Sequence, residues 1–273
     1  MKIQYQDRFI TVFESSLYRT TSSVIRLNNS ILVVDPNWLP IEVDFIASYC
    51  DSHYPDFPVF LLFTHSDYDH IIGYKKFHKA KVIASIYFVN QTSKDKIIHQ
   101  INEFDDEYYI QRDYPIVYPE ADFVIQVDGD KLCIDHIELT FYHAHGHNND
   151  GMIVCIPELY LMIAGDYLSN IEIPMIDDNR YDYTDTLEKF IHIVQEHPNI
   201  HMMIAGHGDL AINRGEIIRR LQNDKKYLKI LEECMDQTNP TDKSEVYSHL
   251  SLYTDNPNML KIHRRNIEKL KEQ

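Results

Sequence analysis

The chain has 273 residues, of which 44% are hydrophobic and 25% are charged, a composition typical of a globular protein with one large or two small domains. Its net charge of −16 argues against binding nucleic acid or anionic lipid through a broad basic face. The N-terminus lacks the apolar core of a signal peptide, and no run approaches the ~18 apolar residues of a membrane span. We therefore expect a cytoplasmic protein with no membrane contact.

The first half of the chain is predicted to contain short strands alternating with helices. Apolar or β-branched runs predict strands over residues 10–13, 24–27, 31–34, 59–63 and 81–84. Asn28-Asn29-Ser30 signals a hairpin turn between the second and third of these strands. Helical spacing predicts helices over 40–49, from His70 to about residue 77, and over 85–108.

The second half begins with strands and ends with helices. We predict strands over 123–127 and 137–142, joined as a hairpin through Asp128-Gly129-Asp130, and further strands over 152–156, 159–164 and 199–205. Residues 167–184 are expected to be a long loop, 183–196 a helix, and 213–273 helical with a break near Asn239-Pro240. Two strand-rich runs followed by helices predict a pair of mostly antiparallel sheets with helices outside.

The four cysteines lie far apart and form no CxxC pair. We interpret them as small buried residues in a reducing compartment rather than as disulfides or zinc ligands: Cys50, Cys133, Cys155 and Cys234.

Four stretches share one pattern, in which a buried strand is followed by a sharp turn that carries His or Asp. They are residues 61–70, 141–151, 161–168 and 202–209. The first places His65, Asp67, Asp69 and His70 within six residues, where they would repel or desolvate one another without a cation. Each stretch alone is most often an ordinary turn, but the four together in this order indicate a metal site.

This order of motifs resembles the metallo-β-lactamase-fold hydrolase superfamily over about residues 9–220. The family motif HxHxDH corresponds to His65-Ser66-Asp67-Tyr68-Asp69-His70, HxPGH to His143-Ala144-His145-Gly146-His147, GD to Gly165-Asp166 and GHG to Gly206-His207-Gly208. The resemblance implies an α/β (α+β) fold, a four-layer αββα sandwich of two mixed β-sheets over residues 1–220. A helical extension over 221–273 would pack on the same domain.

The resemblance also implies a ligand set for two divalent metal ions. One ion would be bound by His65, Asp67 and His147, the other by Asp69, His70 and His207, and Asp166 would bridge them. Asp69 and Asp166 would also be catalytic. Asp35, in the early Asp-Pro turn, would orient a ligand without binding metal.

Two departures from the family pattern bear on the metal and the ligands. Asp67 replaces the usual histidine and adds one negative charge, so zinc is the first expectation but manganese or iron is allowed. His145 replaces the usual proline and could be an alternative ligand, a group behind the ligands or a proton donor. Gly146 permits a tight turn, which favours His147 as the ligand.

Several polar residues near these motifs are candidates for contact with a substrate or a ligand. His143, Asn148 and Asn149 follow a predicted strand, and Arg180, Tyr181 and Tyr183 end the 167–184 loop, where they could meet an anionic group. Ordinary polar turns and a solvated loop are the alternative interpretations.

The expected function is that of a dinuclear metal hydrolase whose metal-bound hydroxide attacks a small ester, thioester, lactone or amide. An alternative is a di-iron redox protein of the flavodiiron type without its flavodoxin domain. A phosphodiesterase or nuclease and a non-catalytic metal protein are further alternatives. The expected partner is a small-molecule substrate, with no nucleic acid, and a homodimer is an open prediction.

Overall fold

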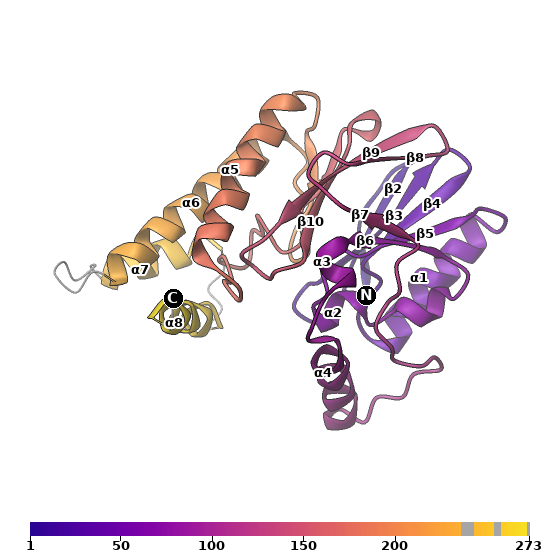
Figure 1. The fold of residues 1–273 in the computed structure, drawn as a ribbon, viewed down its shortest axis with the longest axis horizontal. Coiled ribbons are helices and arrows are strands. Elements are labelled where there is room, and N and C mark those ends of the chain that lie inside the picture. Colours follow the sequence, from indigo (N-terminus) through magenta and orange to yellow (C-terminus); the bar gives the residue numbers. More distant parts are fainter. Residues whose placement is uncertain (236–242, 254–257, 272–273) are drawn as a thin grey trace.

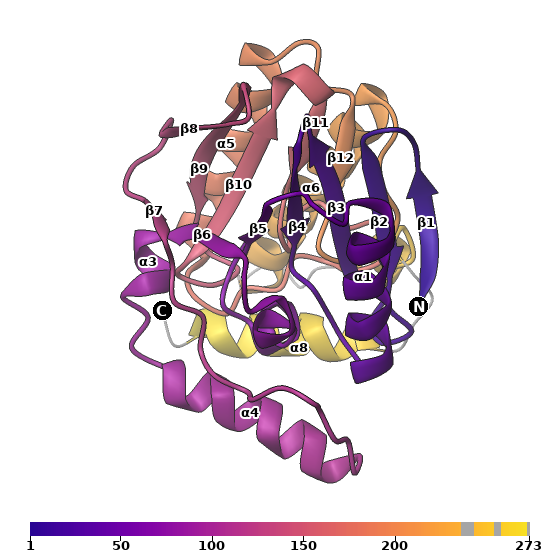
Figure 2. The same ribbon diagram turned by 90° about the vertical axis from the view of Figure 1, so that its right-hand side faces the viewer.

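The computed structural model describes residues 1–235, 243–253 and 258–271, which form two β-sheets packed face to face between layers of helices (Figures 1 and 2). The first sheet has its strands in chain order: β1 (Lys2–Gln6), β2 (Ile10–Glu14), β3 (Thr21–Leu27), β4 (Ser30–Val34), β5 (Val59–Leu62), β6 (Lys81–Ser85) and β7 (Phe123–Ile125). Pairs from β1 to β4 are antiparallel and pairs from β4 to β7 are parallel.

The second sheet is also mixed. Its strands lie in the order β12 (Met202–Ile204), β11 (Leu161–Ile163), β10 (Gly151–Ile156), β9 (Ile137–Ala144) and β8 (Lys131–Ile134). Strands β11 and β12 are parallel, and the other neighbours are antiparallel. The prediction of two mixed sheets is therefore confirmed.

Three apolar clusters define the four layers of the sandwich. Alternate residues of both sheets, such as Leu32 and Val154, form the cluster between the sheets. The outer face of the first sheet packs on α1 (Pro40–His53) and α4 (Lys94–Glu107). The outer face of the second sheet packs on α5 (Arg180–Glu196) and α6 (Arg214–Met235). The predicted αββα order of layers follows directly from this burial.

The remaining helices are short or lie near the C-terminus. Helix α2 (Tyr68–Ile71) and the 3₁₀ turn Tyr74–Phe77 follow β5, and α3 (Ile86–Val89) precedes α4, so the single helix predicted over 85–108 is in fact two. Helices α7 (Lys243–Leu250) and α8 (Asn258–Lys271) complete the chain. Helix α6 continues through residue 220, and the predicted break at Asn239-Pro240 lies outside the described residues.

The predicted hairpin at Asp128-Gly129-Asp130 is wrong. Strand β7 belongs to the first sheet, and the strand that precedes β9 in the hairpin is β8, which was not predicted. The Asp-Gly turn exists, with Gly129 at φ 83°, but it carries the chain from one sheet to the other. The hairpin turn is instead Asp135-His136, whose positive φ angles of 54° and 68° suit a tight two-residue reversal.

Two further expectations can be compared with the described residues. All four cysteines are free, but only Cys50 and Cys155 are buried as predicted, because Cys133 is exposed and Cys234 is half-buried. No helix among residues 1–235, 243–253 and 258–271 is long and apolar enough to span a bilayer.

One edge of the sandwich collects the ends of five strands. Strands β4 and β5 are parallel, β11 and β12 are parallel, and β9 runs in the direction of β11 because two antiparallel steps separate them. The two sheets are joined at this edge, where the Thr21 amide donates to Gly206 O at 2.7 Å. The loops after these strands therefore meet in one place.

Candidate metal centre

The loop after β5 supplies four side chains to the centre. His65 and His70 are buried, and α2 begins at Tyr68, so Asp69 and His70 project from its first turn. Asp35, after β4, accepts hydrogen bonds from the Thr64 amide at 2.9 Å and the Thr64 hydroxyl at 2.6 Å. These bonds tie the start of the β5 loop to the end of the neighbouring strand.

The second sheet supplies the other three side chains, and two glycines allow their approach. Gly146, at φ 112°, lies against the backbone of Tyr183, where a Cβ atom would collide. This close turn precedes His147, the residue that the sequence analysis favours as the ligand. Gly206 lies against the carboxylate of Asp166, and a side chain there would occupy the place of that carboxylate.

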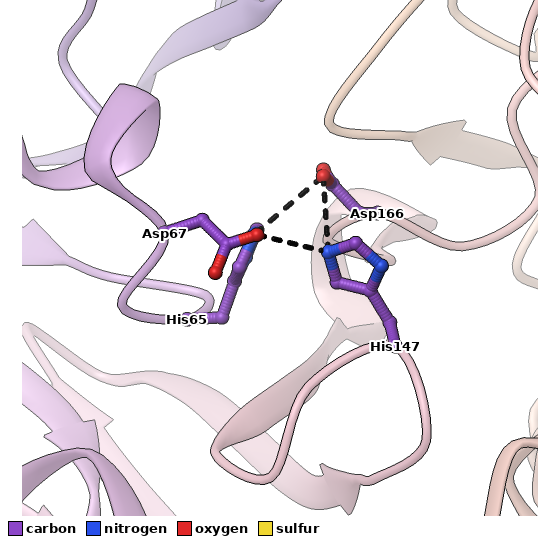
Figure 3. A group of neighbouring side chains, drawn as sticks. All are labelled: His65, Asp67, His147 and Asp166. Atoms are coloured by element: carbon purple, nitrogen blue, oxygen red, sulfur yellow. Dashed lines mark hydrogen bonds and ion pairs between the residues drawn. The ribbon is translucent and has the colours of Figure 1, made fainter. Parts of the chain in front are cut away.

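His65, Asp67 and His147, together the His147 group, point toward one another and toward Asp166 (Figure 3). Asp67 Oδ2 lies 3.2 Å from His147 Nε2 and 3.7 Å from His65 Nε2. Asp166 Oδ2 lies 3.4 Å from His147 Nε2 and 3.6 Å from His65 Nε2.

Asp69, His70 and His207, together the His207 group, lie on the other side of Asp166. Asp69 Oδ2 is 3.6 Å from both His70 Nε2 and His207 Nε2. Asp166 Oδ1 lies 3.2 Å from His70 Nε2, and Asp166 Oδ2 lies 3.2 Å from His207 Nε2. Asp166 therefore faces both groups.

These spacings fit metal coordination. Two atoms each about 2.1 Å from one tetrahedral ion are about 3.4 Å apart, close to the separations in both groups. The buried Nε2 atoms of His65 and His70 and Oδ1 of Asp166 have no hydrogen-bond partner among the described residues. Buried polar atoms are rarely left unpaired, so these atoms fit the ligands of a cation.

The opposite nitrogen of each histidine is held from outside the centre. Nδ1 lies 2.9 to 3.0 Å from an acceptor in each case: Thr64 Oγ1 for His65, Asp35 Oδ2 for His70, Met175 O for His147 and Tyr18 O for His207. A carbonyl or carboxylate acceptor requires a proton on Nδ1. The neutral ring then directs the lone pair of Nε2 into the centre, as metal ligation requires.

Proton affinities also show that the centre attracts positive charge. Burial lowers the pKa of His147, but the hydrogen bond to Asp67 and the charges of Asp166 and Asp67 outweigh it and raise the pKa to about 9. Burial likewise opposes the rise for His207, whose pKa reaches about 10 because of Asp166 and Glu172. Burial raises the pKa of Asp166, yet His207, His70 and His65 hold it well below its usual range. The carboxylates that favour imidazolium would equally favour divalent cations.

A small cavity opens beside the centre, with about 280 Å³ of empty space including its mouth. His147, Asp166 and His207 form one wall. The other walls come from the 167–176 loop, α5 and α6: Leu168, Ser169, Glu172, Ile173, Pro174, Met175, Tyr183 and Asp224.

Of the other predicted site residues, some lie at the centre and some do not. Asp35 contacts His70, Asn148 Nδ2 donates to Asp67 Oδ1 at 3.3 Å, and Tyr183 lines the cavity. Arg180 instead forms an ion pair with Glu232 at 2.6 Å and does not line the cavity, because it starts α5 on the side facing α6.

His143 and His145 both pack against Tyr87 and stack on each other, with ring centroids 5.9 Å apart, rather than joining the metal groups. His143 Nε2 lies 3.2 Å from Gln126 O, and His145 Nδ1 lies 2.9 Å from Asn149 O. Burial lowers the pKa of His143. Both are therefore strand-end histidines held by backbone carbonyls.

Three residues at or beside the centre were not predicted from the sequence: Thr64, Glu172 and Asp224. Thr64 links Asp35 to His65, and the two acids line the cavity. An acid between isoleucines in Ile171-Glu172-Ile173 was a usable signal for Glu172. Asp224 carried no local signal, because it lies among other charged residues of a long helix.

Comparisons with known proteins agree with this geometry. The sequence model of the metallo-beta-lactamase superfamily matches residues 18–207. A search of curated protein sequences finds no match.

Solved structures share the fold at low sequence identity. The inverting sec-alkylsulfatase Pisa1 from Pseudomonas sp. superposes with a TM-score of 0.64 at 13% identity, covering 85% of this chain and 42% of that one. A metallo-beta-lactamase from Pontibacter korlensis has a TM-score of 0.57 at 12% identity, covering 81% and 99%. The DIM-1 metallo-beta-lactamase has a TM-score of 0.54 at 14% identity, covering 83% and 97%. This chain thus spans less than half of the alkylsulfatase, and the likeness concerns the fold.

Proposed function

Because this chain belongs to the metallo-beta-lactamase superfamily, we propose that it is a hydrolase that holds two divalent metal ions, one in each of the two groups. The observation that carries the proposal is the position of Asp166, whose carboxylate oxygens lie 3.2 to 3.6 Å from histidines of both groups. Zinc is the first expectation, with manganese or iron allowed by Asp67.

Different residues of the chain would have different roles in the reaction. When bound, two divalent ions supply Lewis-acid activation of water and of a substrate oxygen. Asp35, Thr64 and Met175 O keep the histidine rings aligned for this task. We assign to Asp69 the acceptance of a proton during turnover, because its Oδ2 lies in the His207 group, 3.6 Å from Nε2 of both His70 and His207.

The proposed substrate is a small ester, thioester, lactone or amide. The cavity beside the centre is small, and Leu168, Ile173 and Met175 give it apolar walls. The alkylsulfatase neighbour adds a sulfate ester as a further substrate class to test.

Elemental analysis of the purified protein together with a substrate panel tests this proposal. The panel contains an ester, a thioester, a lactone, an amide, a sec-alkyl sulfate and a phosphodiester. We expect about two metal ions per chain and hydrolysis of one acyl substrate, lost on chelation and restored by metal. A metal-loaded protein that is inactive on every member would contradict the proposal.

A di-iron redox protein remains the second candidate, because Asp67 places a carboxylate 3.2 Å from His147 Nε2. Iron content together with oxygen consumption in the presence of a reductant would favour it. The charge of −16 disfavours the nuclease alternative, which cleavage of the phosphodiester would support. A cytoplasmic location, in keeping with four free thiols, and a homodimer remain proposals.

A further inference from the structure

The cavity beside the metal centre has an acidic wall in addition to the predicted ligands His147, Asp166 and His207. Glu172 comes from the loop after β11, Tyr183 from α5 and Asp224 from α6. Helix α6 begins at Arg214, beyond the residues that the family model matches. This wall is therefore partly built by a segment that the family model does not cover.

Tyr183 presents a polar atom that lacks a partner. Its side chain is fully buried, and its hydroxyl makes no hydrogen bond with any described residue. Burial, followed by the charges of Asp224, Tyr167 and Asp166, raises the pKa of Tyr183 well above its usual value, so the group stays protonated. Tyr183 lines the cavity together with Asp224 and Asp166. An unpaired buried hydroxyl is unfavourable unless a ligand satisfies it.

Glu172 presents a carboxyl group to the same space, and burial raises its pKa above the usual value. Its backbone amide donates to Ser169 Oγ at 3.2 Å, which holds the residue in the loop. His207 Nδ1 lies 3.9 Å from Glu172 Oε2, too long for a hydrogen bond. No donor to this carboxylate is found in the part of the chain that the structure describes, so Glu172 can accept from a ligand.

Asp224 is a fixed part of this wall. The Tyr253 hydroxyl donates to its Oδ1 at 2.8 Å, and Arg220 on the same helix donates to Leu168 O at 3.3 Å. Burial raises the pKa of Asp224 to about 7, against the hydrogen bonds from Tyr253 and the Leu168 backbone. A deprotonated Asp224 adds negative charge behind the Tyr183 hydroxyl.

We propose that this cavity is the subsite for the part of the substrate next to the scissile bond, and that it accepts a short group ending in a protonated amine. The ammonium would donate to Glu172 and to the Tyr183 oxygen, two acceptors that the protein leaves open. A carboxylate in the same position would face Glu172 and Asp224 and be repelled. This subsite rests on the proposed function, because a metal-bound substrate would place its side group here.

Three hydroxamates of matched length test the subsite by binding rather than turnover. They share a metal-chelating head and end in an ammonium, a methyl or a carboxylate: β-alanine hydroxamate, butyrohydroxamate and succinic monohydroxamate. Calorimetric titration of the full-length, metal-loaded protein should give affinities in that order, with about a tenfold step between the first and the second at low salt. Equal affinities, a preference for the carboxylate or no binding of any of the three would overturn the subsite.

Two variants and a control test whether Glu172 and Tyr183 cause the preference for the ammonium ligand. Glu172→Gln should reduce the ammonium-over-methyl preference to about threefold or less, whereas Glu107→Gln, at an exposed position on α4, should leave it unchanged. Tyr183→Phe should also lower the affinity for the ammonium ligand. It should not lower the melting temperature, because it removes only an unpartnered oxygen. A preference that persists in both variants would refute the assignment.

Metal content separates the two proposals. If the purified protein takes up no metal, the proposed function fails before any hydroxamate is added. If it takes up two ions and hydrolyses an acyl substrate, but the three hydroxamates bind alike, only the subsite fails.

Discussion

The His147 group and the His207 group contain the same side chains, two histidines and one aspartate, but they have different surroundings. The side chain of Asp67 in the His147 group is 32% exposed, whereas that of Asp69 in the His207 group is 11% exposed. Identical ligands therefore need not bind metal equally well, because solvent competes more strongly at the first group.

The groups that accept hydrogen bonds from the histidine Nδ1 atoms also differ between the two sites. In the His207 group, His70 is held by Asp35, a buried carboxylate at the end of a central strand. In the His147 group, His147 is held by Met175 O in the loop between β11 and α5. Asn266 of α8 forms two hydrogen bonds with this loop: it donates to Pro174 O at 2.7 Å and accepts from the Ile176 amide at 3.1 Å. The end of strand β4 thus supports His70 directly and His65 through Thr64, whereas the C-terminal helix α8 supports the loop that holds His147.

Replacing the side chain that the two groups share should have the largest effect. We expect Asp166→Asn to lower the affinity for both metal ions by more than about 100-fold, because the change removes a charge that faces four histidines. Elemental analysis after dialysis measures the loss, with the exposed Asp56→Asn as a matched control. Retention of two ions would show that Asp166 does not bridge the groups.

Removing one histidine should empty one group of its metal ion and leave the other group occupied. We expect His147→Ala to abolish activity and to lower the metal content from about two ions to about one, because the His207 group keeps its own ligands. Metal content and hydrolysis are measured on the same preparation. Unchanged metal content would refute the assignment of His147.

Asp35→Asn tests the support of the buried group. The amide keeps the shape of the side chain but loses the charge beside His70 Nδ1, so metal affinity should fall about 10- to 100-fold. Competition with a fluorescent chelator measures the affinity of each ion. A smaller loss in the His207 group than in the His147 group would contradict the proposed division of support.

Asn266→Ala should have the smallest effect, and it should fall on the other group. Loss of the two hydrogen bonds to the loop costs about 1 kcal/mol each and lets Met175 O move. The affinity of the His147 group for its metal ion should therefore fall about 3- to 10-fold. The chelator competition shows which ion changes, and thermal unfolding confirms that the chain remains folded. Equal weakening of both ions would mean that the helix supports the whole centre.

Much of the centre could be predicted because its signals are local. The spacing from His65 to His70, the glycines beside His147 and His207, and the Asp-Pro turn at Asp35 each follow a run of apolar residues. Strand ends that carry His or Asp can be read within ten residues of sequence. The β7–β9 region was misread because Asp128-Gly129 signals a reversal without saying to which sheet the chain returns.

The acidic wall of the cavity could not be predicted in the same way. Glu172, Tyr183 and Asp224 lie up to about 50 residues apart and belong to a loop and two helices, and no spacing relates them. Their significance depends on which hydroxyl lacks a partner and which carboxylate is buried. Both are properties of packing, and neither is a property of any segment.

By itself, the sequence determined the ligand types and the order of layers, because continuous apolar runs mark strands that are buried on both faces and the turns that follow them carry the ligands. Tertiary structure alone decided how firmly each ligand is held and what the neighbouring cavity presents to a substrate. Those properties arise from contacts such as Asn266 with Pro174, where residues 92 positions apart are brought together by helix packing.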